Sequence, residues 1–298
     1  PDGGMASVVD GIARLARELG VAFETGTAVT GIEPVADGVV LATEAGGRTA
    51  DRVVSDVPPA YTERELLPPG TADHDPDHWS SLTYGPAAFM LYLGVEGTLD
   101  SLAHHTLVFP TDWRPHFESI FETPGWPADP AYYVNVPSRT DDGVAPDGHE
   151  TVVVLVPIAP GLDDGSERRA RYRERVLDDL ADHAGVDLRD RIVVEESACV
   201  SEFAAMGYPQ GTALGLAHTL TQTGPFRPSH RSNAVPGLYY TGSFTDPGIG
   251  VPMVLVSGEH AAAAVRADAR ADAGADAGPA ALAAARSLLS TPTVGRSD

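Results

Sequence analysis

One short turn contains four residues that could leave backbone N–H groups open to a ligand: Pro247, Gly248, Gly250 and Pro252. It lies in the run TDPGIGVPMVLVSGEHAAAAV at residues 245–265, after the apolar stretch GLYYTG at 237–242. This order predicts a short buried strand, a tight turn and the start of a helix. Glycine allows a ligand to approach closely, and the start of a helix carries about +0.5 of a charge. The turn would suit a phosphate or an electron-rich heteroaromatic carbonyl, although a plain strand–turn–helix connection fits the same residues.

Other groups with chemical potential are few. Gly3 and Gly4, before the first helix, repeat the glycine signal more weakly. The run DHDPDH at 73–78 has the residue types of a metal site, but Pro76 would break a helix that aligned His74 and His78, so we favour a solvated acidic loop. The adjacent residues His104 and His105 would point to opposite faces of a strand. We therefore expect no metal site.

Several common catalytic signatures are absent from the sequence. There is no G-x-S-x-G, and Gly248 and Gly250 are followed by Met253 rather than by the third glycine of a G-x-G-x-x-G. The sequence has no lysine, which rules out a Walker loop within it. Cys199 is the single cysteine, so it forms no intrachain disulfide, and we expect a buried, inert thiol.

The composition sets the class of protein. The 298 residues suggest roughly two domains, and 43% hydrophobic residues can bury a sizeable core. The net charge of -22, with arginine as the sole strongly basic residue, excludes a nucleic-acid partner and disfavours anionic membranes. Such an acidic surface suits a protein that stays soluble in concentrated salt, while a GC-rich genome would produce a similar composition.

The predicted elements place the turn in an α/β protein. Apolar residues at helical spacing predict a helix over residues 5–19, and a charged amphipathic pattern predicts another over 168–183. Prolines on both sides of residues 61–67 indicate a domain boundary. We interpret the aromatic residues at 113–126 as packing in the core or in a lid, or as the wall of a cavity for a large apolar ligand. Strands are predicted at 21–25, 28–33, 39–43, 48–55, 87–95, 102–109, 131–136, 151–158 and 191–200.

The stretches GTALGLAHTLTQTGPFRP and GLYYTGSFTDPGIGVPMVLVSGEHAA, within residues 211–262, closely resemble the C-terminal signature of the phytoene desaturase family. These enzymes are FAD-dependent carotenoid oxidoreductases. Further stretches agree, namely PDGGMASVVDGIARLARELG, ADRVVSDVP, LAHHTLVF and VPSRTDDGVAPDG, so the resemblance spreads over residues 1–268. Family members also carry an N-terminal G-x-G-x-x-G unit that this sequence does not contain. We therefore expect the C-terminal part of such an enzyme: a truncated gene, a fragment or half of a split protein.

The resemblance implies a two-domain α/β flavoprotein. Residues 1–66 and 209–268 would form part of an FAD-binding domain. Residues 67–208 would form a substrate domain with a mixed sheet and covering helices, in agreement with the proline-marked boundary. Residues 269–298 are rich in alanine and aspartate and would form a mobile tail.

The resemblance also implies desaturation of a long isoprenoid, with hydride transfer to the flavin of FAD. It gives no catalytic residue, and Glu202, Asp246 and Glu259 are candidates for a proton acceptor by residue type alone. A carotenoid isomerase, a later-step carotenoid desaturase, an amine-oxidase-like enzyme and a non-catalytic isoprenoid-binding remnant are the alternatives. The residues implied to contact FAD are Gly3, Gly4, Met5, Gly242, Ser243, Asp246, Pro247, Gly248, Ile249, Gly250, Val251 and Pro252.

The implied substrate determines the expected partners and location. A C40 hydrocarbon is practically insoluble in water, so the enzyme must take it from a bilayer. No uncharged apolar segment reaches 18 residues, and the N-terminus lacks the pattern of a signal peptide. We therefore expect a cytoplasmic protein that is peripheral to the membrane, with an oligomeric state that the sequence leaves open.

Overall fold

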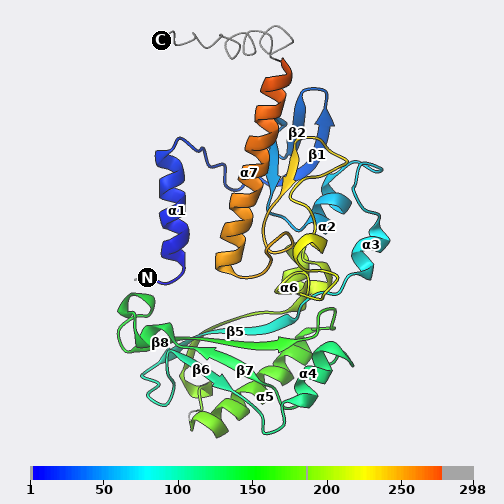
Figure 1. The fold of residues 1–298 in the computed structure, drawn as a ribbon. Helices are drawn as coiled ribbons and strands as arrows, with labels where there is room; N and C mark the ends of the chain where they lie inside the picture. Colours follow the sequence, from blue (N-terminus) through cyan, green and yellow to red (C-terminus); the bar gives the residue numbers. More distant parts are fainter. Residues whose placement is uncertain (1–2, 186, 277–298) are drawn as a thin grey trace, which may run out of the picture.

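The computed structural model describes residues 3–185 and 187–276, which form two regions around separate sheets (Figure 1). The larger sheet has the strand order β6-β7-β8-β5-β9, and every neighbouring pair is antiparallel. Its strands were predicted within a few residues, and they are β5 (Ala87–Glu96), β6 (His105–Val108), β7 (Tyr132–Asn135), β8 (His149–Ile158) and β9 (Ile192–Ala198).

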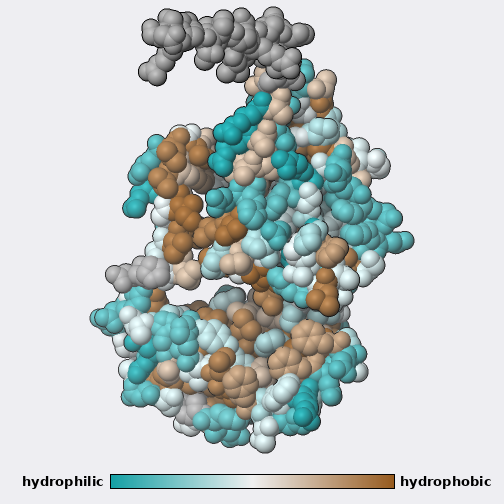
Figure 2. Space-filling model, viewed as in Figure 1, coloured by the Kyte–Doolittle hydropathy of each residue, from teal (hydrophilic) through white to brown (hydrophobic). Residues whose placement is uncertain are grey.

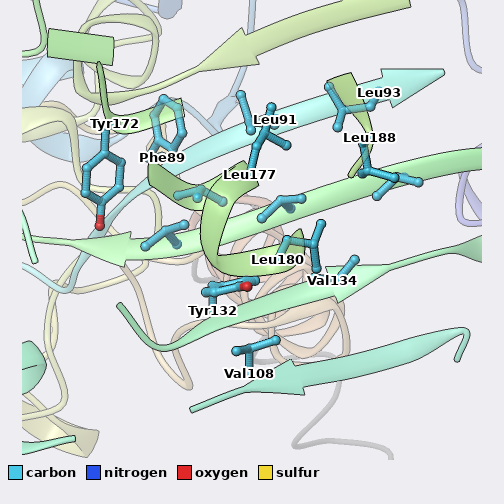
Figure 3. Packing of buried hydrophobic residues seen from close by; sticks show 14 of the residues in the cluster. Phe89, Leu91, Leu93, Val108, Tyr132, Val134, Tyr172, Leu177, Leu180 and Leu188 are labelled. Atoms are coloured by element: carbon cyan, nitrogen blue, oxygen red, sulfur yellow. The ribbon is translucent and has the colours of Figure 1, made fainter. Parts of the chain in front are cut away.

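Helix α5 (Ser166–Ala184) covers one face of this sheet. Its apolar side, including Leu177 and Leu180, packs on alternate residues of the strands such as Leu91 and Val134 (Figure 3). Cys199 belongs to the same core and is buried as predicted, and burial raises the pKa of its thiol to about 12. The face covered by α5 is the main hydrophobic core of the described chain.

The opposite face of the large sheet is apolar but only partly covered. Along β8 every second residue is fully buried, while the intervening residues Val153, Leu155 and Pro157 are half-buried. Helix α4 (Arg114–Phe121) packs beside the end of β8. It was not predicted as a helix, because its aromatic residues were interpreted by type and not by their spacing of four.

The second region contains two small sheets. Strands β1 (Val29–Val35), β2 (Gly38–Thr43) and β3 (Arg48–Ala50) form an antiparallel sheet. Strand β4 (Val53–Ser55) pairs in parallel with β10 (Leu238–Tyr240), so residues far apart in sequence meet in one small sheet. The predicted strand at 21–25 is wrong: residues 21–24 have no regular structure and no strand partner, and Thr25 begins a turn.

Short helices and one long helix complete this region: α2 (Pro59–Tyr61), a π-helical turn (Thr62–Leu66), α3 (Pro76–Ser81) and α7 (Val251–Asp276). Helix α6 (Val200–Ala205) follows β9 and packs against β5 and β9 of the large sheet. Helix α7 extends into the segment 269–298 that we predicted as a mobile tail. The rest of that segment lies outside the described residues. Within the described parts of the chain, no helix is both long enough and apolar enough to cross a bilayer.

Helix α1 (Ala6–Glu18) forms where the sequence predicted it, but none of its residues is buried. Its apolar side, which includes Val9, Ile12 and Leu15, faces solvent in the described structure. Figure 2 shows this as brown surface over α1 and beside the start of α7. The strongly amphipathic pattern therefore has no partner among the described residues.

Candidate functional site

The glycine–proline turn lies at the carboxyl ends of the parallel strands β4 and β10. The backbone N–H of Thr241 donates to the carbonyl of Ser55 at 3.0 Å, so the two chain segments leave the sheet side by side. The segment after β10 then runs through residues 242–250 and enters α7 at Val251. In α/β proteins ligands bind outside the carboxyl ends of parallel strands, so this is the expected edge for a cofactor.

Backbone conformation explains why glycine occupies this turn. Gly242 and Gly248 have φ values of +97° and +118°, which side chains rarely adopt. A Cβ at Gly242 would collide with the carboxylate of Asp56, and a Cβ at Gly248 would lie 2.6 Å from the ring of His218. At Gly250 no atom lies within 4 Å of such a Cβ. The turn is therefore packed at its first two glycines and open at the third.

A buried serine fixes the start of the turn from the side of α7. Ser257 is fully buried, and its hydroxyl accepts a hydrogen bond from the N–H of Gly242 at 2.9 Å. The same hydroxyl lies 2.7 Å from the hydroxyl of Thr245, which donates to the carbonyl of Gly242. These bonds satisfy the polar groups that the turn buries and hold it against the helix.

A buried arginine fixes the turn from the opposite side. Arg227 is 6% exposed and donates to three backbone carbonyls. Its Nη2 lies 2.7 Å from the oxygen of Ser243, its Nε 3.2 Å from that of Thr245, and its Nη1 3.2 Å from that of Gln222. Burial lowers the pKa of the guanidinium, although Asp246 nearby favours its charged form. Residues 242–248 are thus held on both sides before any ligand binds.

The start of α7 suits the cofactor that the sequence resemblance implies. The hydrogen bond from the N–H of Val254 to the carbonyl of Gly250, at 2.9 Å, closes the first helical turn. The N–H groups that precede it have no partner within a helix, and Pro252 has none to satisfy. Val251 and Met253 are exposed apolar residues beside them. An apolar, N–H-lined and open surface fits the edge of a flavin ring.

The first glycines of the chain contact the segment between β7 and β8. The N–H of Gly3 donates to the carboxylate of Asp141 at 2.7 Å, and Gly4 lies beside Val144. The hydrogen bonds from the Gly143 and Gly3 N–H groups lower the pKa of Asp141. The structure gives no contact between these glycines and the turn at 242–252, so the role of Gly3, Gly4 and Met5 in cofactor binding stays a prediction.

An apolar cavity of about 320 Å³ lies on the open face of the large sheet. The strand register places Met90, Leu155, Tyr133 and Leu107 in one row across four strands of this face. The cavity extends from α4 to residues 213–214, which run beside Gly85 and Pro86. Gly215 follows there, and a Cβ on it would lie 3.2 Å from the hydroxyl of Ser243 in the turn. The cavity therefore leads from the outer edge of the sheet toward the glycine turn.

Few polar groups reach this face. His116 lines the cavity, but it is buried, its Nδ1 accepts from the N–H of Ala131 at 3.1 Å, and burial lowers the pKa of its ring. At the β6 edge, His105 Nδ1 lies 2.6 Å from the hydroxyl of Tyr133. Our expectation that His104 and His105 point apart is wrong: their ring centroids lie 4.2 Å apart, because the strand begins only at His105.

The three candidate proton acceptors differ in availability. Glu202 is engaged, since it pairs with Arg169 at 2.7 Å and accepts from the N–H of Cys199, and the Arg169 guanidinium lowers its pKa. Asp246 lies in the turn, 3.6 Å from the ring of His260. Glu259 is exposed on α7. Of the three, Asp246 is the carboxylate within the turn.

Sequence reasoning missed Asp56, Arg227 and Ser257. Asp56 follows β4 directly, and partial burial against the turn raises the pKa of its carboxyl group. The run ADRVVSDVP indicated a strand end there, which was a usable signal. Arg227 and Ser257 gave none, because they bind main-chain atoms of residues distant in sequence.

The DHDPDH loop is not simply solvated. The ring of His74 lies 3.2 Å from the buried carboxylate of Glu63, which also accepts from the indole of Trp79 at 2.9 Å. His74 and His78 stack with centroids 4.2 Å apart. Even so, no cluster of three or more His, Cys, Asp or Glu side chains suited to a metal occurs in the parts of the chain that the structure describes.

A glycine turn held at the carboxyl ends of parallel strands, with an apolar cavity on a second sheet, is the arrangement at which α/β proteins bind a cofactor. Comparison with known families identifies which one. Residues 1–266 match the flavin containing amine oxidoreductase family, and the chain belongs to it. This confirms the predicted α/β flavoprotein class and the flavin cofactor of the family.

Curated relatives bear out the resemblance to phytoene desaturases. The chain is 57% identical over 270 residues to a carotenoid 3,4-desaturase of Haloarcula japonica, covering 90% of this chain and 54% of that protein. It is 36% identical to a zeta-carotene-forming phytoene desaturase of Myxococcus xanthus, covering 86% and 50% of the two chains. The chain thus spans about half the length of the curated relatives it matches.

Solved structures share the fold at low identity. Wild-type putrescine oxidase bound to putrescine superposes with a TM-score of 0.57 at 17% identity, over 89% of this chain and 53% of that one. An oxidoreductase from Methanosarcina mazei gives a TM-score of 0.55 at 16% identity, over 86% and 53% of the two chains. These likenesses extend the fold assignment across both regions of the chain.

Proposed function

We propose that this chain is part of an FAD-dependent enzyme of carotenoid biosynthesis that desaturates a phytoene-like isoprenoid. The observation that carries the proposal is the apolar cavity that leads from α4 toward the glycine turn. Its lining offers a hydrocarbon chain no carboxylate and no arginine, and its one histidine, His116, is buried. The similarity to carotenoid and phytoene desaturases supports the same substrate class.

The alternative functions have less support. An amine-oxidase-like activity would require a cavity that accepts a polar, basic substrate, whereas this one is lined by apolar side chains apart from His116 and two tyrosines. A carotenoid isomerase, a later-step desaturase and a non-catalytic isoprenoid-binding remnant would use the same apolar surface. The desaturase names of the relatives favour oxidation of a carbon–carbon bond over isomerisation or simple binding.

In this proposal the residues of the chain bind the cofactor and the substrate, orient them and exclude water. The turn at residues 246–252 and the first N–H groups of α7 would hold the flavin edge, while Arg227 and Ser257 keep that turn in place. When bound, FAD supplies the two-electron oxidation that converts a C–H/C–H pair into a double bond. Asp246 and Asp56 are the carboxylates close enough to the turn to accept a proton.

We propose further that a nucleotide-binding unit from outside these residues completes the cofactor site. The chain spans about half of its curated relatives and contains no G-x-G-x-x-G. The open apolar side of α1 and the exposed Val54 on β4 form the surface on which such a unit would pack. The glycines Gly3 and Gly4 would then approach the flavin at the edge of that interface.

The decisive experiment combines the chain with such a unit, FAD and phytoene. We expect desaturated products by chromatography and a flavin absorbance band in the purified protein. Gly250→Val, which fills the open space at the turn, should lower conversion at least tenfold, because Gly250 has a φ of +114° and no atom lies within 4 Å of where its Cβ would be. The matched change Gly258→Ala, inside α7 with nothing within 4 Å, should leave conversion unchanged. No conversion of phytoene, lycopene or a hydroxylated carotenoid would contradict the proposal.

Two further properties follow from the same proposal. The protein would act in the cytoplasm as a peripheral membrane protein, because its hydrocarbon substrate resides in bilayers. Its net charge of -22 would suit work in concentrated salt, where the Debye length is about 3 Å and self-repulsion is screened. A melting temperature that does not rise with potassium chloride would overturn the second property.

A further inference from the structure

Helix α4 has two apolar sides, and one of them faces outward. His116 and Ile120 are buried toward the protein, whereas Trp113, Phe117 and Phe121 follow each other at a spacing of four and are 55%, 43% and 58% exposed. Trp113 meets Phe117 edge to face at 5.5 Å between centroids, and Phe117 stacks on Phe121 at 6.2 Å. The outward side of α4 is therefore a continuous aromatic stripe.

The aromatic stripe continues onto the neighbouring strand and rims the cavity. Leu107 and Phe109, at the end of β6, are more than half exposed. Both residues line the apolar cavity together with Phe117 and Phe121, so the stripe and the cavity share walls. The other end of the cavity reaches residues 213–214, and the next residue, Gly215, lies beside Ser243 of the glycine turn. An apolar molecule resting on the stripe therefore lies at the rim of a cavity that extends to the segment beside that turn.

We propose that the outward side of α4 and the end of β6 dock on a lipid surface with neutral headgroups, so that the hydrocarbon passes from the bilayer straight into the cavity. This inference rests on the proposed function, since only a bilayer substrate requires such a path. An amphipathic helix of this kind buries its apolar side about 5–10 Å into the boundary between headgroups and acyl chains. A tryptophan at one end of the stripe is typical of residues that settle at that boundary.

The charge of the segment selects the type of lipid. Asp112, Glu118 and Glu122 against Arg114 give residues 112–122 a net charge of -2, and the whole chain carries -22. Anionic headgroups would repel such a surface, and Arg114 is the single arginine within residues 105–130, which contain the stripe. Neutral headgroups, such as those of phosphatidylcholine, therefore fit the stripe.

The protein contains its own probe for this contact. Trp79 is buried, Trp126 is half-buried in the core, and Trp113 is the exposed one of the three tryptophans. Adding phosphatidylcholine vesicles to the 298-residue chain should shift the tryptophan emission to shorter wavelength. Vesicles of brominated phosphatidylcholine should quench it. Trp113→Phe should remove at least four-fifths of the quenching, and no quenching of the wild-type chain would overturn the proposal.

Variants separate α4 from other exposed apolar surfaces. Phe117→Ser with Phe121→Ser should weaken flotation with vesicles at least tenfold, because two phenylalanines lose their burial in lipid. The matched pair Leu220→Ser and Phe226→Ser, also exposed and apolar but away from α4, should float as the wild type does. Loss of flotation with Ile12→Ser and Leu15→Ser on α1, together with unquenched Trp113, would overturn the proposal.

Two further outcomes count against lipid docking. A dimer that dissociates in the Phe117→Ser, Phe121→Ser variant would show that a second copy covers the stripe. Binding that requires phosphatidylglycerol would contradict the choice of neutral headgroups. All these measurements omit substrate and cofactor, so they stand apart from the desaturation assay with detergent-solubilised carotenoid, and either result can fail alone.

Discussion

Helices α1 and α5 have the same kind of sequence and opposite fates in the structure. Both alternate apolar and charged residues at helical spacing, and both were predicted from that pattern. The apolar side of α5 is buried in the main core, whereas α1 buries no residue at all. Amphipathicity thus specifies which side of a helix is to be covered but not what covers it, and the two helices divide the chain into a self-contained sheet region and a region with open surfaces.

The strongest test of this contrast is a pair of matched truncations. Leu177→Ala on α5, where the residue is 1% exposed, should lower the free energy of unfolding by about 2–5 kcal/mol, because it leaves a cavity in the core. Ile12→Ala on α1, where the residue is 50% exposed, should change it by less than about 0.5 kcal/mol. Urea unfolding followed by circular dichroism measures both, and an equal cost at the two sites would abolish the contrast.

The second test concerns the region of the small sheets and asks how much the buried hydrogen bonds of Arg227 stabilise it. Arg227→Met leaves three buried carbonyls without a donor and should cost about 3 kcal/mol. Arg231→Met removes an arginine nearby in sequence that pairs with Asp268 at the surface, and should cost less than about 1 kcal/mol. Urea unfolding measures the free energy of unfolding of both variants. A loss below about 1 kcal/mol for Arg227→Met would mean that other contacts hold the turn.

The smallest expected effect is a difference in pH dependence between the regions. Burial raises the pKa of Glu63, so its stability contribution is complete below the ordinary value of 4.5 and is lost as pH rises through the folded pKa. The Arg169 guanidinium lowers the pKa of Glu202, so its contribution is present above 4.5 and is lost as pH falls through the folded pKa.

Glutamine variants isolate the two contributions. Glu63→Gln should reduce the fall in melting temperature as pH rises above 4.5. Glu202→Gln should reduce the fall in melting temperature as pH drops below 4.5. Each difference should correspond to about 1 kcal/mol or less in the free energy of unfolding. Melting curves from pH 3 to 8, compared with the wild type, give both slopes. Identical profiles for the two variants would contradict opposite shifts at Glu63 and Glu202.

Periodic patterns made much of the fold predictable from the sequence. The apolar runs at residues 87–95 and 151–158 identified β5 and β8, and the spacing at 168–183 identified α5, because burial of one side leaves a regular trace. The stretch at 21–25 has strand-like residues but no neighbouring strand, so it forms none. Strand propensity depends on the partner, which a single segment does not encode.

The candidate site was predictable where backbone geometry required glycine. Gly242 and Gly248 could be identified because few other residues adopt their conformations. Asp56, Arg227 and Ser257 reach the turn only through the tertiary fold. The residues of the turn that they contact lie 12 or more positions away from them in the sequence. The cavity was anticipated only as one interpretation of the aromatic residues at 113–126, since its walls come from six separate segments.

The alternation along β8 has a consequence for how such proteins diverge. Val152, Val154 and Val156 support the core, while Val153, Leu155 and Pro157 face the opposite way. Substitutions at odd-numbered positions can reshape the surface offered to a hydrocarbon at little cost to folding, whereas those at even-numbered positions cannot. Inserting a single residue in this strand would exchange the two sets of residues, so that both the core packing and the cavity wall would be lost. This wall can therefore change by substitution but not by a change in strand length.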